Sequence, residues 1–414
     1  MRVIQPYFFI IGLLLSGCFF GLRAQAPIKN SLFADNYQID TEGDPLRLSI
    51  ENLSFFKNNE TDGDIFDGYS LPGFRLNPRL IYQPFPVVRL EAGISMLRFW
   101  GADKYPCYSY QHISEWKADG YQYGFHVLPF FRAQIQPIKQ VNIVLGTIYN
   151  GDNHRVIEPL YNPELNLTAD PECGAQLLYN ARIAHADIWI NWESFTFKND
   201  VHHEAFTVGG SAALNITPET AFFHWSIPAQ VLALHIGGEL DTTGQDVTTM
   251  INGAAGMKFQ FNFNRGLKNI SLQSYGCMYD SPFNPGFFYS KGWGLYSAIS
   301  AQIRNLNLKA SHWRSRDFIN VFGNPVYENL SLTLDGRVFP RTEIFNGGFS
   351  YEQTFGNEYH VGIDANFYYN PRLVAYDSFA QDISAPLKTS KSVNYSFGVY
   401  IRINPTIILN KKKL

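Results

Sequence analysis

The sequence predicts an all-β fold, a transmembrane antiparallel up-and-down β-barrel of about 16 strands, within a range of about 14 to 18. Three observations support this prediction. Apolar and polar residues alternate with period two, tight turns alternate with long polar stretches, and aromatic residues make up 16% of the chain although its mean hydropathy is −0.15. Because outward apolar and inward polar residues cancel in any window average, a barrel in lipid has this composition.

The alternation is clearest in three segments, 257–263, 359–367 and 393–404. Successive side chains of a strand point to opposite faces, so each segment has one apolar and one polar face. The strands of a soluble sandwich also alternate, but they are usually about five or six residues long. The longer segments here, with aromatic residues such as Trp189 and Phe259 near their ends, favour a lipid environment.

Turn signals define the strand count. Tight connections are expected near residues 84–86, 138–139, 185, 217–218, 265–267, 305 and 356–357. External loops are expected at 58–69, 101–120, 151–172, 197–203, 241–247, 281–290, 315–342 and 370–390. Seven turns and eight loops give sixteen strands with both termini in the periplasm. Residues 330–334 also resemble a strand, and we assign them to an excursion within the loop 315–342.

The N-terminus predicts export. Residues 1–24 have the charge, apolar core and small-residue end of a signal peptide, with cleavage after Ala24 or Ala26. A competing lipobox ends at Cys18, which would then be lipidated. We expect a periplasmic N-terminal segment at 25–45, the barrel at 46–404 and a periplasmic tail at 405–414.

Three cysteines follow the leader, Cys107, Cys173 and Cys277, and all are expected in or near external loops. An oxidising compartment permits a disulfide such as Cys107 to Cys173, although the sequence does not fix the pair.

The polar register of the strands predicts the lumen wall. Its charged residues are Arg47, Glu51, Arg75, Arg79, Arg89, Glu91, Arg132, Arg182, Asp187, Glu193, Lys258, Arg304, Lys309, Asp364 and Arg402. Basic side chains outnumber acidic ones, which suggests passage of small polar, anionic solutes. The alternative is that these charges pair across the lumen and brace the barrel. Bulky inward residues such as Phe130 and the long loop 315–342 leave open whether the lumen is plugged.

Sites of chemistry are few. His154, Arg155 and Tyr161 in the loop 151–172 suit ligand capture, and equally suit packing against neighbouring loops. His224 and Ser226 resemble the His-x-Ser of outer-membrane phospholipases, in which the His activates the Ser hydroxyl. That family has an orienting Asn where this chain has Gly238. We therefore expect no enzymatic activity, no metal and no cofactor.

The hairpin running from Gly73 to Pro84 and turning into the segment from Val88 to Ile94 resembles the barrel strands of Bacteroidota outer-membrane proteins, as does the segment from Trp313 to Pro325. The resemblance implies a porin-like outer-membrane barrel and carries no catalytic residues. The expected partners are outer-membrane lipid, the barrel-assembly machinery and small solutes, with an oligomer allowed and nucleic acid excluded by a net charge of −3.

Three functions are in competition. The first is a weakly selective pore, the second a non-transporting barrel that binds partners or serves as a scaffold through its surface loops, and the third an outer-membrane hydrolase.

Overall fold

The structure, a computed structural model, describes residues 33, 37–39, 46–62, 64–100, 125–195, 203–238, 247–282, 288–356, 358–379 and 385–410. Within these residues, sixteen long antiparallel strands form a closed barrel, because β1 pairs with both β2 and β17. The wall strands are β1 (Leu46–Glu60), β2 (Tyr69–Phe85), β3 (Val88–Phe99), β4 (Phe125–Ile138), β5 (Val141–Thr147), β6 (Cys173–Asn180), β7 (Ala184–Ser194), β8 (Ala205–Asn215), β9 (Phe223–Ile236), β10 (Thr248–Asn262), β11 (Leu267–Asp280), β12 (Lys291–Ile303), β13 (Leu306–Arg316), β15 (Arg341–Phe355), β16 (Tyr359–Asp377) and β17 (Lys388–Ile403). The predicted fold class and strand number are confirmed.

Two short strands lie outside this count. β14 (Arg337–Val338) pairs with the end of β16, and Leu330 bridges Val338. The segment 330–334 therefore lies within the long connection between β13 and β15 and is not a strand of the barrel wall, as the sequence analysis predicted. β18 (Thr406–Asn410) pairs with the start of β1, at residues 46–49.

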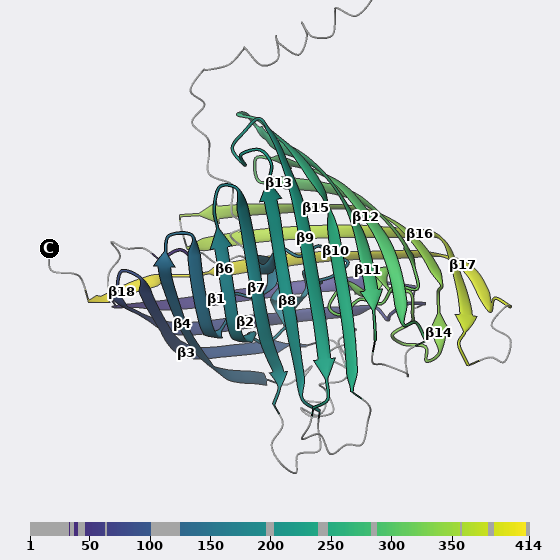
Figure 1. Cartoon of the computed structure of the whole chain (residues 1–414), viewed down its shortest axis with the longest axis horizontal. Helices are drawn as coiled ribbons and strands as arrows, with labels where there is room; N and C mark the ends of the chain where they lie inside the picture. Colours follow the sequence, from purple (N-terminus) through teal and green to yellow (C-terminus); the bar gives the residue numbers. More distant parts are fainter. Residues whose placement is uncertain are drawn as a thin grey trace, which may run out of the picture.

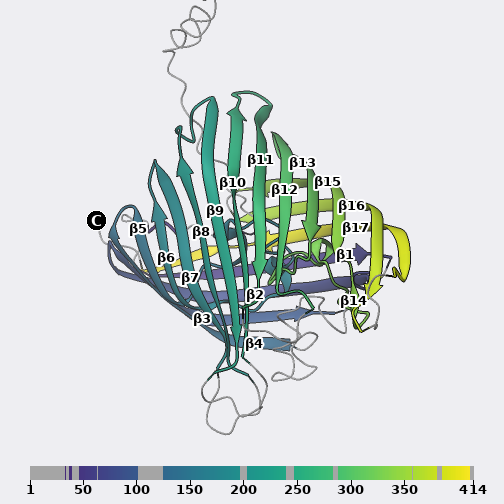
Figure 2. The ribbon, with the colours of Figure 1, turned by 45° about the vertical axis from the view of Figure 1, so that its right-hand side comes forward.

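The two ends of the barrel differ. Short connections join β2 to β3, β4 to β5 and the following pairs at one end, which we call the turn end. The long connections leave from the opposite end, the loop end (Figure 1). β1 begins and β17 finishes at the turn end, and Figure 2 shows these two strands side by side. One predicted turn is shifted, because His185 already lies in β7 and the turn occupies residues 181–183.

The period-two alternation fixes which face of each strand meets lipid. On β17, Val393, Tyr395 and Ile401 point outward and are between 42% and 49% exposed. The intervening Asn394 and Arg402 point into the lumen and are at most 5% exposed. An apolar outer face and a polar interior are what a barrel in a bilayer requires.

Aromatic rings gather at both ends of the outer surface. Phe223, Trp225 and Phe259 stack near the turn end, and Trp192 stacks on Phe206 near the loop end. Such bands occupy the two membrane interfaces. Trp189, which the sequence assigned to this group, instead points into the lumen and is 3% exposed.

No helix in the described part of the chain is long and apolar enough to cross a membrane. The described residues contain three helical elements, each about one turn long. η1 (Gly151–His154) and α4 (Leu165–Thr168) lie in the connection between β5 and β6, and η2 (Pro325–Tyr327) follows β13.

Candidate functional site

Two long connections fold into the lumen and meet there. The first, residues 148–172, leaves the wall early because β5 and β6 are short, with the Ile148 amide donating to the Glu172 carbonyl over 2.9 Å. The second is residues 317–340. The Asn162 amide donates to the Phe322 carbonyl over 2.7 Å and the Asn324 amide to the Glu158 carbonyl over 3.1 Å. We call these two segments together the plug. The expectation that 151–172 forms an external loop is therefore wrong.

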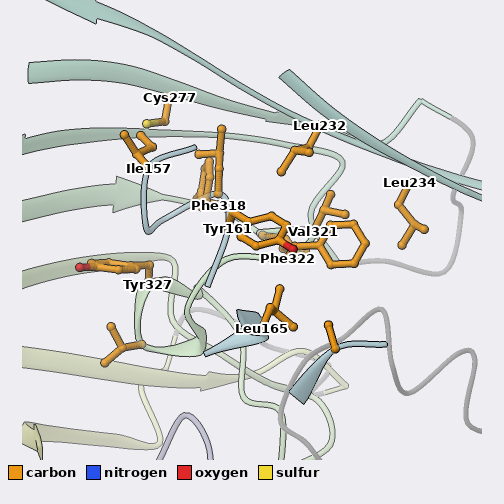
Figure 3. Close-up of a cluster of buried hydrophobic side chains, with 14 of the residues drawn as sticks. Ile157, Tyr161, Leu165, Leu232, Leu234, Cys277, Phe318, Val321, Phe322 and Tyr327 are labelled. Carbon is orange, nitrogen blue, oxygen red and sulfur yellow. The ribbon is translucent and has the colours of Figure 1, made fainter. Parts of the chain in front are cut away.

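The plug has an apolar centre. Figure 3 shows Tyr161 and Phe322 facing each other at this centre, with Leu232 of the wall nearby. Leu232 and Tyr327 are fully buried. These buried apolar side chains of the plug and the wall form a close-packed core inside the barrel, as in the interior of a soluble domain.

Polar contacts attach the plug to opposite walls. The Gln230 side chain of β9 accepts from the Ile157 amide over 3.0 Å. On the other side Tyr69 of β2 donates to Glu164 over 2.7 Å, and Lys309 of β13 contacts Glu158 at 2.6 Å. The plug therefore spans the lumen from wall to wall.

His154 is the most buried of the plug's titratable contacts with the wall. Its Nδ1 lies 2.7 Å from Asp187 and its Nε2 lies 3.0 Å from Glu172, while its ring stacks on Trp189 at 3.6 Å. Burial alone would lower the pKa of His154, but Glu172 and Asp187 outweigh it and raise the pKa to about 9. The imidazolium therefore clamps the plug to β7 at neutral pH.

This clamp predicts a loss of stability in alkali. A His whose pKa is raised in the folded state contributes stability that is full below its unfolded pKa of 6.5 and is lost as the pH rises through about 9. We expect the urea midpoint of unfolding to fall over this window in the wild type and to fall less in His154→Gln. Identical profiles for the two proteins would contradict a charged His154.

The wall charges form paired networks. Glu91 lies within 3.6 Å of Arg79, Arg89 and Arg132, and Glu51 contacts both Arg79 and Arg402. Most of the charged residues assigned to the lumen do point inward: Arg47, Glu51, Arg75, Arg79, Arg89, Glu91, Arg132, Asp187, Glu193, Lys258, Lys309, Asp364 and Arg402. Arg182 and Arg304 were placed wrongly, because both lie exposed in turns at the turn end.

A row of polar side chains lies on the outer face, where the wall should be apolar. Ser274, Ser297 and His312 are directly paired across β11, β12 and β13. The Ser274 and Ser297 hydroxyls are 2.9 Å apart, and His312 Nε2 lies 3.0 Å from Glu343 Oε1 on β15. We call Ser274, Ser297, His312 and Glu343 the lipid-facing row.

Such a row is costly in lipid. A Lys or Arg on the lipid face of a barrel costs about 2–4 kcal/mol near the bilayer midplane, a carboxylate costs less, and both costs fall toward the interfaces. Ionisable groups at membrane depth are therefore functional candidates by default. The sequence analysis missed this row because its members come from four different strands. The signal that could have found it is the apolar outward register of β13, which His312 interrupts two residues after Ala310.

Arginine side chains lie between this row and the loop end of the barrel. Arg314 and Arg316 follow His312 on the same face of β13, and Arg341 begins β15; all three are exposed. Arg316 contacts Asp317 at 3.2 Å. The loop-end rim of these strands is therefore basic.

The predicted His-x-Ser pair lies elsewhere. His224 and Ser226 point into the lumen near the turn end, with exposures of 6% and 4%, and His224 Nδ1 lies 2.9 Å from the Thr217 carbonyl. A lipid ester in the bilayer does not reach these side chains.

The predicted loop-binding residues are part of the plug. His154 and Tyr161 are buried, Tyr161 donating to Glu172 over 2.9 Å, and Arg155 has a left-handed backbone with φ of 55°. Cys173 is an exposed free thiol and Cys277 a buried one. Cys107, Cys18 and the signal peptide lie outside the described residues.

These features define the class: a β-barrel of the outer membrane, with an apolar outer wall and a lumen crossed by a plug. The chain belongs to the family described as Lipid A 3'-O-deacylase-type, whose model matches residues 38–412. This finding overturns the expectation of no enzymatic activity, because the family is described by one.

Comparison with solved structures gives distant barrels. The anion-selective porin from Comamonas acidovorans has a TM-score of 0.45 at 10% identity, covering 87% of this chain and 100% of that one. The outer membrane protein OmpT of Vibrio cholerae has a TM-score of 0.44 at 9% identity, with the same coverage. OprD from Pseudomonas aeruginosa has a TM-score of 0.41 at 8% identity, covering 91% of this chain and 97% of that one. No curated protein matches.

Proposed function

We propose that this protein is an outer-membrane hydrolase that removes an ester-linked acyl chain from lipid A. The observation that carries the proposal is the lipid-facing row, a Ser, a His and a Glu set side by side on the outer wall. Family membership supplies the substrate class. A lipid in the membrane meets the outer wall laterally, so its ester can reach this row without entering the lumen.

The row has the parts of an acyl-transfer site. Glu343 engages Nε2 of His312, which leaves Nδ1 for the neighbouring Ser297. His312 takes the Ser297 proton as Oγ attacks the ester carbonyl, and returns it to the departing sugar hydroxyl. Water then attacks the acyl-serine with His312 again as base, releasing a fatty acid and restoring Ser297. Glu343 stabilises the imidazolium formed in each step. Catalytic hydrogen bonds are often completed only when substrate is bound.

The depth of the row suits the outer leaflet. With the turn end in the periplasm, the loop end faces outward. His312 lies four residues before Arg316, the last residue of β13. At about 3.3 Å per residue and a tilt of about 40°, this places His312 about 10 Å below the end of the strand. The acyl esters of a glycolipid lie just below its headgroup, at comparable depth.

Mass spectrometry of lipid A tests the proposal. Purified protein in mixed micelles with lipid A should yield free fatty acid and a product lighter by one ester-linked acyl chain. His224→Ala with Ser226→Ala should retain this activity, because both side chains face the lumen. Unchanged lipid A after incubation with heat-modifiable, folded protein would refute the proposal.

The second candidate is a pore for small polar, anionic solutes. The excess of basic over acidic side chains among the inward wall residues favours it, since such charges shape the potential along a pore. Ion pairs such as those of Glu51 with Arg79 and Arg402 offset part of this charge. The plug weighs against it. Planar-bilayer recording separates the two candidates, because a pore gives conductance steps and a plugged barrel gives none. A reversal potential that favours potassium over chloride would exclude the anion preference.

A further inference from the structure

A cavity of about 440 Å³ lies in the lumen beside the plug, and its lining runs from Glu60 and Tyr69 at the loop end of β1 and β2 toward the turn end. Its roof is formed by plug residues, among them Glu158 and Glu164, and its walls by β1, β2, β11, β12, β13, β15, β16 and β17. It reaches Gln302 and Asn307, which flank the turn between β12 and β13. Its size falls within the range of small-molecule sites.

Aromatic hydroxyls and carboxylates are fixed in place around the roof. Tyr69 donates to Glu164, which also accepts from Asn59 over 2.8 Å. Tyr400 donates to Asp364, which contacts Lys57 at 2.7 Å. Groups held by several partners are pre-organised, so a ligand loses little free energy in ordering them.

Apart from Glu352, the lower wall is polar and uncharged. Asn269 donates to Gln302 over 2.9 Å, and Asn307 donates to Ser350 over 3.3 Å. Each amide and hydroxyl can both donate and accept, so this wall suits a ligand rich in hydroxyl groups.

The charges around the cavity are mostly negative. Among its described lining residues, two lysines, Lys57 and Lys309, face six carboxylates: Glu60, Asp152, Glu158, Glu164, Glu352 and Asp364. An acidic surround repels anions. Several of these carboxylates already have partners, Asp364 and Glu158 in the two lysines and Glu164 in Tyr69 and Asn59, so they do not require a cationic ligand. Together with the amides and hydroxyls of the lower wall, they suit a neutral, polyhydroxylated one.

We propose that this cavity is a binding site for a short, uncharged oligosaccharide. Tyrosine rings offer flat apolar faces to sugar rings, while the carboxylates and amides accept and donate hydrogen bonds to sugar hydroxyls. The site lies inside the barrel and away from the lipid-facing row, so it is independent of the proposed hydrolysis.

Titration calorimetry tests the site. Full-length folded protein in detergent is titrated with maltotriose, chitotriose and the anionic trigalacturonate. We expect binding of at least one neutral trisaccharide with a Kd of about 1 mM or tighter, and at least tenfold weaker binding of trigalacturonate. Absence of heat for both neutral trisaccharides, or preference for trigalacturonate, would overturn the proposal.

Neighbouring residues of β12 provide a matched pair of variants. Ser300 lines the cavity, whereas Ile299 points outward and is 47% exposed. Ser300→Trp should fill the cavity and weaken binding at least tenfold, and Ile299→Trp should bind as the wild type does. Heat-modifiable migration of both variants shows that the barrel has formed. Equal binding by the two variants places the ligand elsewhere and contradicts the inference.

Discussion

Ser297→Ala is expected to lower the rate of lipid A deacylation by at least about 10³-fold, because removal of the nucleophile from an acyl-transfer site leaves only binding and background hydrolysis. The loss should appear in kcat, with KM nearly unchanged, since the hydroxyl contributes little to the binding of a large glycolipid. The measurement is the release of fatty acid from lipid A in mixed micelles by the purified variant.

Variants of the neighbouring residues separate chemistry from structure. His312→Gln should lose activity to a similar extent, and Glu343→Gln less, because the Gln still orients the ring but no longer stabilises its charge. Ser274→Ala is the comparison variant: it removes a hydroxyl from the same row, and with it the contact to Ser297, but keeps the Ser297, His312 and Glu343 side chains, so its activity should fall far less. Full activity in folded Ser297→Ala would exclude this residue as the nucleophile.

The wall could be predicted because its rules are local. Alternation along the segment 393–404 needs only adjacent residues to assign each side chain to a face, and β17 follows it. The strand count depended on turn signals such as Gly356, whose φ of 63° suits a tight turn. Each of these signals is contained within a few consecutive residues of the sequence.

The plug and the lipid-facing row depend on contacts between distant residues. Lys309 and Glu158 are 151 positions apart, and nothing near either residue indicates the other. Ser297, His312 and Glu343 come from three strands, whose register decides that they meet. The sequence did contain one local signal, an ionisable residue in an apolar register, but its meaning depends on knowing which register faces lipid.

Excision of the first plug segment is expected to convert a silent barrel into a conducting one. Residues 148 and 172 already lie side by side, with the Ile148 amide on the Glu172 carbonyl, so a short glycine linker in place of 150–170 can close the hairpin between β5 and β6. The deletion removes the contacts that hold Phe322 and Asn324 across the lumen. We expect the wild type to give no conductance steps in planar bilayers and the deletion variant to give frequent ones.

A point substitution in the same segment distinguishes an opened lumen from a damaged barrel. Glu158→Gln removes the ion pair with Lys309 but leaves the apolar centre around Tyr161 and Phe322, so it should remain silent. The deletion variant should keep its heat-modifiable migration, because the wall strands pair with one another without the plug. If wild type and deletion variant conduct equally, the plug does not close the lumen and the pore becomes the better proposal. If only the deletion variant conducts, substrate has no route through the wild-type lumen, which leaves the outer wall as the place where a lipid meets this protein.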